Sequence, residues 1–579
     1  MTMPPAAAPI VVDQPQRNRL DAWIAELTAG AARWAATGLD ERAALLVAVH
    51  SSMAANAQRW ALIGGALKRL PVDSPLLGEE WMSGPYAALS GAGTLAQTVV
   101  ALSRGGSPLA DVRFGTAPGG RVTVPALPRN TRERLLLHGF SAQVWMPPGK
   151  TEAAVRAEAG LGELTPDHNG GVGLVLGAGN ITSIPALDVL YELVANNRSS
   201  LLKLNPVMGS MLPVFQAALA PLIRFGVLRI IDGGADVGSY LAHHPGIAHV
   251  HITGSIVTHD AVVYGPGAAG AERKAANRPL LDKPIASELG GVGPIIVLPG
   301  DWTKRDLRFQ AEHVATQRLH NGGYNCIAGQ LVVLSADWPQ RDTFRAELRA
   351  AVERAPIRPA WYPGSDDRVR SAATAYPLAE RLGPGGGRLL IDLHQGDDAA
   401  TLACTEYFSP VLGVVELAGT GQAFLDAAVE LANHDLLGTL GANIIATPRT
   451  IKGLGGGFWE AVARLRYGTI GINAWTGVGF LTAAAPWGAY PGHTLGDIQS
   501  GIGWVHNALL IDCPERTVVR GPFRPFPRSL RHGEFALSPK PPWFLNAKSA
   551  ATTGRLLSEF AAKPSLAKLP GIFVSAFRA

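Results

Sequence analysis

The sequence predicts an α/β protein whose central element is a doubly wound parallel sheet. Between residues 170 and 255, apolar runs alternate with helical segments, and a second such alternation extends from about 283 to 443. Alternating strands and helices are typical of a parallel sheet with helices on both faces. The composition agrees, because 47% hydrophobic residues, 17% charged residues and 67 glycines are typical of a compact α/β enzyme. A chain of 579 residues should form roughly two to four folding units.

The N-terminal part is predicted to be helical. Apolar residues recur at intervals of three and four in segments 20–35, 40–67 and 84–103, which is the spacing of helices with one buried face. Asp40 is expected to cap the second of these helices. Two strand-like segments follow at 119–127 and 140–149, and we expect them to cover an edge of the sheet.

The doubly wound sheet is expected in the stretch that follows. Strands are predicted at 171–176, 199–204, 228–231 and 249–254, with helices at 184–197, 211–225 and 236–244 between them. In such sheets ligands bind beyond the carboxyl ends of the strands. The second α/β stretch has predicted strands at 294–298 and 330–336 and helices at 308–319 and 341–355. The C-terminal part is rich in Trp, Gly and Pro, which predicts ordered, loop-rich packing on the other domains.

Charge and cysteine content exclude several classes of protein. The net charge of +5 is spread over 51 basic and 46 acidic residues, and without a dense Lys/Arg block we expect no nucleic-acid partner. The cysteines Cys326, Cys404 and Cys513 show no CxxC or Cys/His spacing, which argues against a disulfide scaffold and a structural zinc site. The N-terminus lacks a basic start followed by an apolar run, and no apolar stretch of about 18 residues occurs later. We therefore expect a cytoplasmic protein.

One pair of motifs carries the chemistry. Cys326 lies in NGGYNCIAGQ (321–330), and Glu288 lies 38 positions earlier in SELGG (287–291). A cysteine between a glycine-rich loop and a strand can be surrounded by backbone N–H groups that lower its pKa and bind an oxyanion. Aldehyde oxidation by a thiol needs this nucleophile, a hydride acceptor and a carboxylate that activates water. The two motifs therefore predict a thiol nucleophile with its general base.

From about residue 171 to 443 the sequence resembles the NAD(P)-dependent aldehyde dehydrogenases, with the family's motifs in the same order. SELGG is similar to the family's ELGG segment, which implies that Glu288 is the general base and Cys326 the catalytic cysteine. Asn180 in LGAGNITSIP is similar to the asparagine of the WNFP-type loop. The resemblance implies that its amide, with the backbone N–H of Cys326, holds the oxyanion.

The same resemblance implies a cofactor site for NAD or NADP. Lys203 in LLKLNP matches a lysine that contacts the cofactor ribose, and Gly254 and Ser255 in HITGS match the FTGS turn at the pyrophosphate. Glu406 and Phe408 in TEYFSPV match EIFGPV, where the acid binds the nicotinamide ribose and the aromatic ring lies near it.

Five departures from the family pattern place the sequence in a divergent branch. Gly179 and Ile181 replace the Trp and Phe of WNFP, so the walls of the substrate tunnel must differ. Pro206 stands where the family often has an acid that binds the ribose 2′-OH of NAD, so the choice between NAD and NADP is open. His259 and Ser409 replace two family glycines.

These observations predict four parts. They are a helical N-terminal region (1–125), a dinucleotide-binding domain (126–282), a catalytic domain that carries the thiol (283–470) and a C-terminal extension (471–579). The extension is expected to pack on the core or in oligomer contacts. Its last segment has amphipathic spacing, for which membrane-surface contact is the less favoured alternative. The resemblance also implies a homo-oligomer, a dimer or a tetramer.

Three functions are compatible with the sequence. The leading prediction is oxidation of a small-molecule aldehyde to a carboxylic acid with NAD or NADP, through a thiohemiacetal and a thioester on Cys326. A CoA-acylating or acyl-reducing enzyme is the second, although such family members commonly lack the glutamate that Glu288 represents. A catalytically silent protein with the same fold is the third, in which Asn180 only stabilises a turn and Lys203 only extends its amine to water.

Cys404 and Cys513 are expected to be structural, and the sequence near His249 and His251 shows no metal-ligand spacing.

Overall fold

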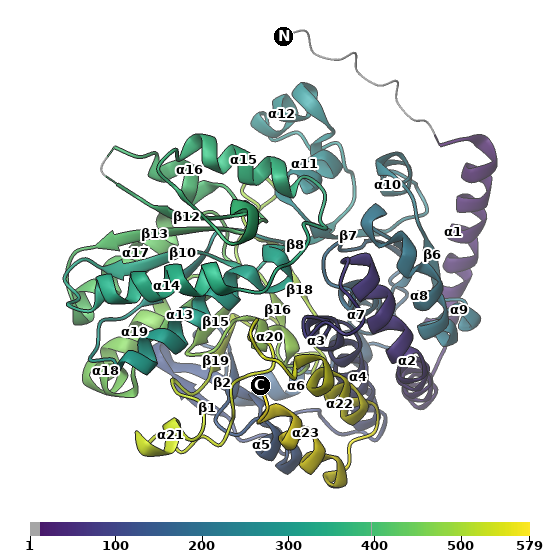
Figure 1. Cartoon of the computed structure of the whole chain (residues 1–579). Helices are drawn as coiled ribbons and strands as arrows, with labels where there is room; N and C mark the ends of the chain where they lie inside the picture. Colours follow the sequence, from purple (N-terminus) through teal and green to yellow (C-terminus); the bar gives the residue numbers. More distant parts are fainter. Residues whose placement is uncertain (1–11, 395) are drawn as a thin grey trace.

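The computed structural model describes residues 12–394 and 396–579 and confirms the predicted α/β fold (Figure 1). Within this part of the chain, the strands form a six-stranded sheet, an eleven-stranded sheet and one short two-stranded pair. The predicted division into four parts stays a proposal, because strands from several of these parts contribute to the same sheets.

The six-stranded sheet has the order β17-β8-β7-β4-β5-β6 and is parallel except for β17. Its strands are β4 (Val172–Leu176), β5 (Ser199–Lys203), β6 (Leu228–Ile231), β7 (His249–Gly254), β8 (Ile285–Leu289) and β17 (Gly501–Ile502). The chain runs from β4 outward to β5 and β6, and then returns to place β7 on the other side of β4. This reversal is the topological switch point at which doubly wound sheets bind their ligands.

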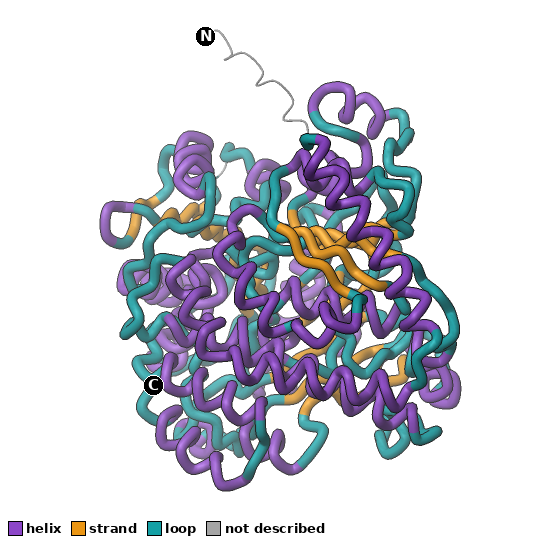
Figure 2. Tube along the Cα trace, turned by 90° about the vertical axis from the view of Figure 1, so that its right-hand side faces the viewer, coloured by secondary structure: helices purple, strands orange, loops and turns teal. Residues whose placement is uncertain are grey.

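Successive residues of these strands contact helices on opposite faces of the sheet. Leu174 of β4 belongs to a buried cluster with Leu27 of α1 (Gln14–Ala35), and this cluster also contains residues of α10 (Ala235–Ala242). Val175 belongs to another cluster, with residues of α2 (Leu39–Leu67), α4 (Ala87–Ser103) and α7 (Ile184–Asn196). Figure 2 shows this sheet with helices beside it. Alternation along each strand therefore explains the two-sided core.

Two local predictions were wrong. Gly38, not Asp40, is the N-cap of α2, and Asp40 instead lies in the first helical turn, where the helix dipole still favours an acid. The single helix expected at 211–225 is divided into α8 (Leu212–Ala218) and α9 (Ala220–Phe225). Pro221 lies in the first turn of α9, and its missing N–H explains the interruption.

The eleven-stranded sheet has the order β1-β2-β3-β19-β15-β14-β9-β10-β13-β12-β11. Its strands are β1 (Gly115–Ala117), β2 (Arg121–Leu127), β3 (Ser141–Trp145), β9 (Gly293–Val297), β10 (Gly329–Ser335), β11 (Glu380–Leu382), β12 (Arg388–Asp392), β13 (Val411–Leu417), β14 (Gly441–Ile445), β15 (Thr469–Ile472) and β19 (Arg516–Arg520). The two strand-like segments expected at a sheet edge are β2 and β3, which continue the sheet beyond β19 by antiparallel pairing. The predicted boundary at residue 126 thus falls inside β2, and β3 pairs with β19 rather than with the smaller sheet.

The C-terminal helix α22 (Ala550–Ala562) packs beside α3 (Leu77–Trp81) and α4, and α23 (Leu569–Ala576) packs beside α22 (Figure 1). Among residues 12–394 and 396–579, no helix combines the length and the apolar composition that a membrane crossing requires.

Candidate active site

Cys326 lies in a tight loop between α13 (Lys304–Leu319) and β10. Asn321, Gly322 and Gly323 all have positive φ angles, of 55°, 73° and 83°, a conformation that glycine and asparagine adopt most readily. The Asn321 amide stabilises the turn by donating to the carbonyl oxygens of Asn180 and Tyr324, each at 3.2 Å. The glycines of the NGGYNC motif therefore fix the backbone that presents the thiol.

Glu288 is on β8, where it pairs with Thr253 of β7 and with Gly501 of β17. Its side chain is buried, and its Oε1 accepts a hydrogen bond of 2.9 Å from Nε1 of Trp487. Glu288 lies close enough to Cys326 for its carboxylate to raise the pKa of the thiol. The structure thus brings together the two residues that the sequence places 38 positions apart.

Burial and neighbouring charges determine the pKa values of Glu288 and Cys326. Burial raises the pKa of Glu288, although hydrogen bonding to Trp487 and Cys326 opposes the increase. Burial and the negative charges of Glu288 and Glu406 raise the pKa of the Cys326 thiol well above its usual value. The backbone N–H of Cys326 lowers the thiol pKa, as expected, but desolvation and two nearby carboxylates outweigh it, so the net shift is upward. The raised pKa favours the protonated thiol at rest.

Asn180 follows β4 and faces the thiol loop. Its Nδ2 donates a hydrogen bond of 2.9 Å to the carbonyl oxygen of Tyr324. An amide nitrogen has two hydrogens, so this bond orients the side chain and leaves the second hydrogen for another acceptor. A Cβ on the adjacent Gly179 would lie 2.7 Å from Cγ of Asn205, so a larger residue there would require the Asn205 side chain to move.

Glu406 and Phe408 approach the site from the segment before β13. A Cβ on Gly290 would lie 1.8 Å from Oε1 of Glu406, so the carboxylate rests directly on the glycine that follows Glu288 and Leu289. Burial raises the pKa of Glu406 to about 8, although the positive charge of Arg318 opposes the increase. The ring of Phe408 lies 5.0 Å from that of Tyr362 and 6.0 Å from that of Tyr324, measured between centroids.

Lys203, Gly254 and Ser255 lie at the carboxyl edge of the smaller sheet, on either side of β4. Lys203 is the last residue of β5, and burial lowers the pKa of its amine. Gly254 ends β7 opposite Leu289 of β8, and Ser255 caps α11 (Ile256–Tyr264) by accepting a hydrogen bond of 3.2 Å from the Thr258 N–H. These residues thus surround the switch point of the sheet, next to the segment that contains Glu288.

An apolar cavity opens onto the thiol. We call it the thiol cavity, and its walls include Ile181, Ile184, Trp475, Phe480 and Trp487 together with Cys326. Ile181 replaces the family's Phe in this wall, as the sequence departure implied.

Comparison with known proteins agrees with this geometry. The sequence model of the aldehyde dehydrogenase family matches residues 202–366. Residues 202–366 are thus similar in sequence to the aldehyde dehydrogenases. The matched segment contains Lys203, Gly254, Ser255, Glu288 and Cys326, whereas Asn180, Glu406 and Phe408 lie outside it.

Solved structures share the fold at low sequence identity. One is an NAD-dependent aldehyde dehydrogenase from Sinorhizobium meliloti, with 21% identity, a TM-score of 0.56 and coverage of 88% of each chain. Another is aldehyde dehydrogenase C from Pseudomonas syringae, solved as a cysteine-to-alanine mutant with NAD+ and octanal, with 19% identity, a TM-score of 0.56 and coverage of 88% of this chain and 90% of that one. These likenesses confirm the superfamily fold for this chain.

The sequence reasoning missed a polar cluster behind Glu288. The Asp188 carboxylate accepts a hydrogen bond of 3.0 Å from Thr253 Oγ1 and lies 2.9 Å from Nε2 of His506 and 3.3 Å from Nε2 of His251. Burial alone would raise the pKa of Asp188, but the two imidazoles hold it well below its usual value. His249 and His251 alternate along the strand and are easily found in the sequence. Their acidic partners could not be predicted, because they lie in a distant segment of the sequence. In the described part of the chain no three His, Cys, Asp or Glu side chains are arranged to hold a metal ion.

Trp487 was also missed as the partner of Glu288. It was visible only as one of many aromatics in the C-terminal part, 199 positions after the glutamate. This hydrogen bond forms because the C-terminal part of the chain returns to the smaller sheet, where β17 pairs with β8.

Proposed function

We propose that this chain is a divergent member of the aldehyde dehydrogenase superfamily and oxidises an aldehyde to the carboxylic acid, with NAD or NADP as hydride acceptor. The observation that carries the proposal is the proximity of the half-buried thiol of Cys326, in the wall of an apolar cavity, to the buried carboxylate of Glu288. A nucleophile with a general base close by is the arrangement that covalent catalysis requires.

The first step is addition of the thiol to the aldehyde. Glu288 accepts the proton of Cys326 as the sulfur attacks the carbonyl carbon, and its raised pKa makes it a stronger base than an exposed glutamate. The oxyanion of the resulting thiohemiacetal receives hydrogen bonds from the free Nδ2 hydrogen of Asn180 and from the Cys326 backbone N–H. The Asn180 bond to Tyr324 keeps the amide in place for this role.

The residues at the switch point fit a dinucleotide. Lys203 supplies a buried cation, Gly254 and Ser255 lie directly before the first turn of α11, and Glu406 supplies a carboxylate near the thiol. When NAD or NADP is bound, its chemistry is acceptance of the hydride that leaves the thiohemiacetal carbon, and Cys326 then carries a thioester. Because Pro206 provides no carboxylate, the residue at this position gives no preference for NAD over NADP.

Hydrolysis completes the cycle. Glu288 first releases the thiol proton to solvent and then accepts a proton from water as the oxygen attacks the thioester carbon. It returns this proton to the sulfur of Cys326 as the C–S bond breaks and the carboxylic acid leaves. The hydrogen bond from Trp487 holds the carboxylate during both proton transfers. Retention of Glu288 supports hydrolysis over transfer to CoA. The mechanism needs a reduced Cys326, which a reducing compartment such as the cytoplasm maintains.

The test is formation of reduced nicotinamide, followed by near-ultraviolet absorbance with NAD and with NADP, for the parent, Cys326→Ala and Glu288→Gln. We expect turnover by the parent only, and a covalent thioester on Glu288→Gln that intact-protein mass spectrometry detects. Formation of acyl-CoA without free acid would instead identify a CoA-acylating enzyme. No turnover and no dinucleotide binding would identify a silent fold. Light scattering on the same protein tests the homo-oligomer that the family resemblance implies.

A further inference from the structure

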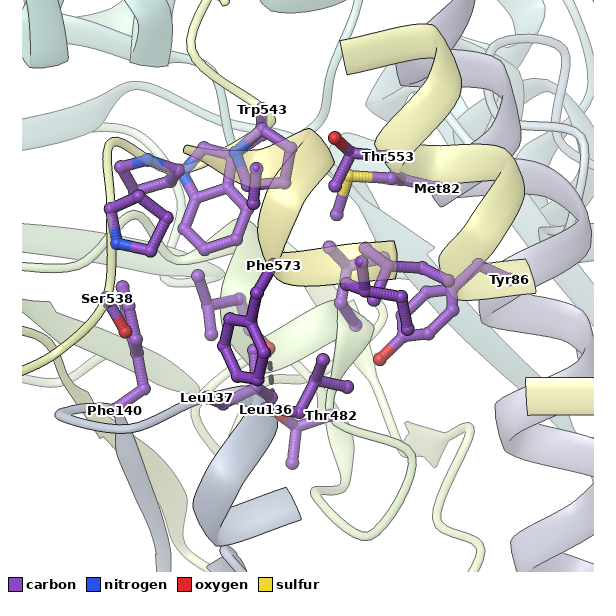
Figure 3. A pocket seen from close by; sticks show the side chains of 18 residues that line it. Met82, Tyr86, Leu136, Leu137, Phe140, Thr482, Ser538, Trp543, Thr553 and Phe573 are labelled. Carbon is purple, nitrogen blue, oxygen red and sulfur yellow. Dashed lines mark hydrogen bonds between the residues drawn. The ribbon is translucent and has the colours of Figure 1, made fainter. Parts of the chain in front are cut away.

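A second apolar cavity adjoins the thiol cavity. We call it the outer cavity; Figure 3 shows Tyr86, Phe140, Trp543 and Phe573 among the side chains around it. Met82, Leu481 and Trp543 line both cavities. The two cavities are therefore neighbours that meet at these three side chains, and Cys326 lines only the thiol cavity.

The outer cavity offers a ligand little polar contact besides the indole N–H of Trp543, which has no hydrogen-bond partner among the described residues. Charged side chains are absent from its lining within the described part of the chain. Its hydroxyls are used by the protein itself, since Thr482 Oγ1 donates to the Val478 carbonyl at 2.7 Å and Thr553 Oγ1 lies 2.8 Å from Ser575 Oγ. Burial raises the pKa of Tyr86 to about 12, so its hydroxyl stays neutral. A charged or strongly polar group would lose its water here without replacement.

The C-terminal helices build one wall of this cavity. Thr553 and Leu557 of α22 and Ile572 and Phe573 of α23 all line it. The wall is held firmly, because α22 packs backbone against backbone on α3, where a Cβ on Gly78 would lie 2.4 Å from the carbonyl carbon of Ala550. The cavity is therefore a preformed feature of the fold, and the C-terminal extension has a place in it.

We infer that the outer cavity binds the hydrocarbon tail of the substrate, so that the preferred aldehydes carry a long, uncharged aliphatic chain. This inference rests on the proposed function, because Cys326 fixes the carbonyl end of the chain in the thiol cavity. An apolar tail that continues past Met82 and Trp543 gains burial with each methylene, whereas a short aldehyde leaves the outer cavity unused.

The test compares kcat/KM for propanal, dodecanal and succinic semialdehyde in the parent and in Leu557→Trp. Leu557 is buried and lines only the outer of these two cavities, so the larger ring fills that space. Leu556→Trp is the matched control, because Leu556 neighbours it on the same helix and lines neither cavity. We expect the parent to prefer dodecanal to propanal by at least about tenfold and to use succinic semialdehyde poorly. Leu557→Trp should lose the preference and keep propanal turnover, while Leu556→Trp should resemble the parent.

Equal use of the three aldehydes by the parent, or an equal loss of propanal and dodecanal turnover in Leu557→Trp, would overturn the inference. If Leu557→Trp fails to fold, as judged by its circular dichroism melt, Ala576→Phe fills the same cavity from α23. If no aldehyde is turned over at all, the proposed function fails. Calorimetric titration with dodecanol then tests binding to the outer cavity without turnover. Binding that is lost in Leu557→Trp supports a site for an apolar chain, and absence of binding to the parent refutes it.

Discussion

Replacement of Trp487 by phenylalanine tests how Glu288 is held. The change removes the indole N–H that donates to Glu288 Oε1 at 2.9 Å and keeps an aromatic ring in a site that is only 2% exposed. A hydrogen bond to a charged group contributes about 1.5–3 kcal/mol. If that free energy is lost from the proton transfers of Glu288, kcat falls roughly 10- to 150-fold.

The pH profile gives a second readout of the same change. Burial raises the pKa of Glu288 and the Trp487 hydrogen bond opposes that increase, so removal of the donor raises the pKa further. The carboxylate form then requires a higher pH, and the acid limb of kcat moves upward. The assay is steady-state formation of reduced nicotinamide between mildly acidic and alkaline pH, with the near-ultraviolet spectrum as signal.

Trp475→Phe is the matched control for Trp487→Phe. Trp475 lines the same thiol cavity, but its Nε1 has no hydrogen-bond partner among the described residues. The same truncation there should change the pH profile little. If both variants lose kcat equally with unshifted acid limbs, the effect comes from packing alone and the role assigned to the Trp487 hydrogen bond is wrong.

Four further outcomes are expected. Asn180→Ala should lower kcat roughly 100- to 1000-fold, as loss of an oxyanion donor does, with dinucleotide binding by fluorescence titration unchanged. Gly290→Ala should weaken dinucleotide binding, because its Cβ would lie 1.8 Å from Glu406 Oε1; an unchanged Kd would exclude a role for that carboxylate. Dinucleotide affinity should rise as the pH increases through about 8, where Glu406 loses its proton and can accept hydrogen bonds, and Glu406→Gln should remove this dependence. Arg42→Met should cost about 3–5 kcal/mol in urea unfolding, because it leaves the buried Glu163 carboxylate, 3.0 Å from the Arg42 guanidinium, without its partner; unchanged stability would contradict the importance of this pair.

The features of the fold that sequence predicted are those that depend on local pattern. The runs that became β4, β5 and β7 are short, apolar and followed by glycine or polar residues, so both their existence and their order could be read directly. The sheet to which each strand belongs could not be predicted, because β3 pairs with β19, more than three hundred residues later. No local periodicity encodes such a partner.

The candidate site divides in the same way. Cys326 and Glu288 lie in glycine-rich motifs whose glycines have steric causes in the structure, such as the contact of Gly290 with Glu406. Trp487 and Asp188 lie in segments without such a signature, and only the folded chain shows their contacts with Glu288 and with the imidazoles. The pKa of the thiol could not be predicted from the sequence either, since it depends on the burial of Cys326 and on two carboxylates from other segments.

The raised pKa of the thiol is consistent with a nucleophile when the reaction is considered as a whole. The thiolate is the form of cysteine that is alkylated and oxidised, so a half-buried thiol with a raised pKa is protected while no substrate is bound. In the proposed reaction, Glu288 takes the proton when an aldehyde lies in the cavity, and the negative charge passes to the carbonyl oxygen, where Asn180 and a backbone N–H receive it. The apolar walls disfavour a lasting negative charge on sulfur. In our proposal the same walls hold the hydrocarbon chain of the substrate. Burial of the thiol and selection of an apolar aldehyde are therefore two consequences of one arrangement of side chains.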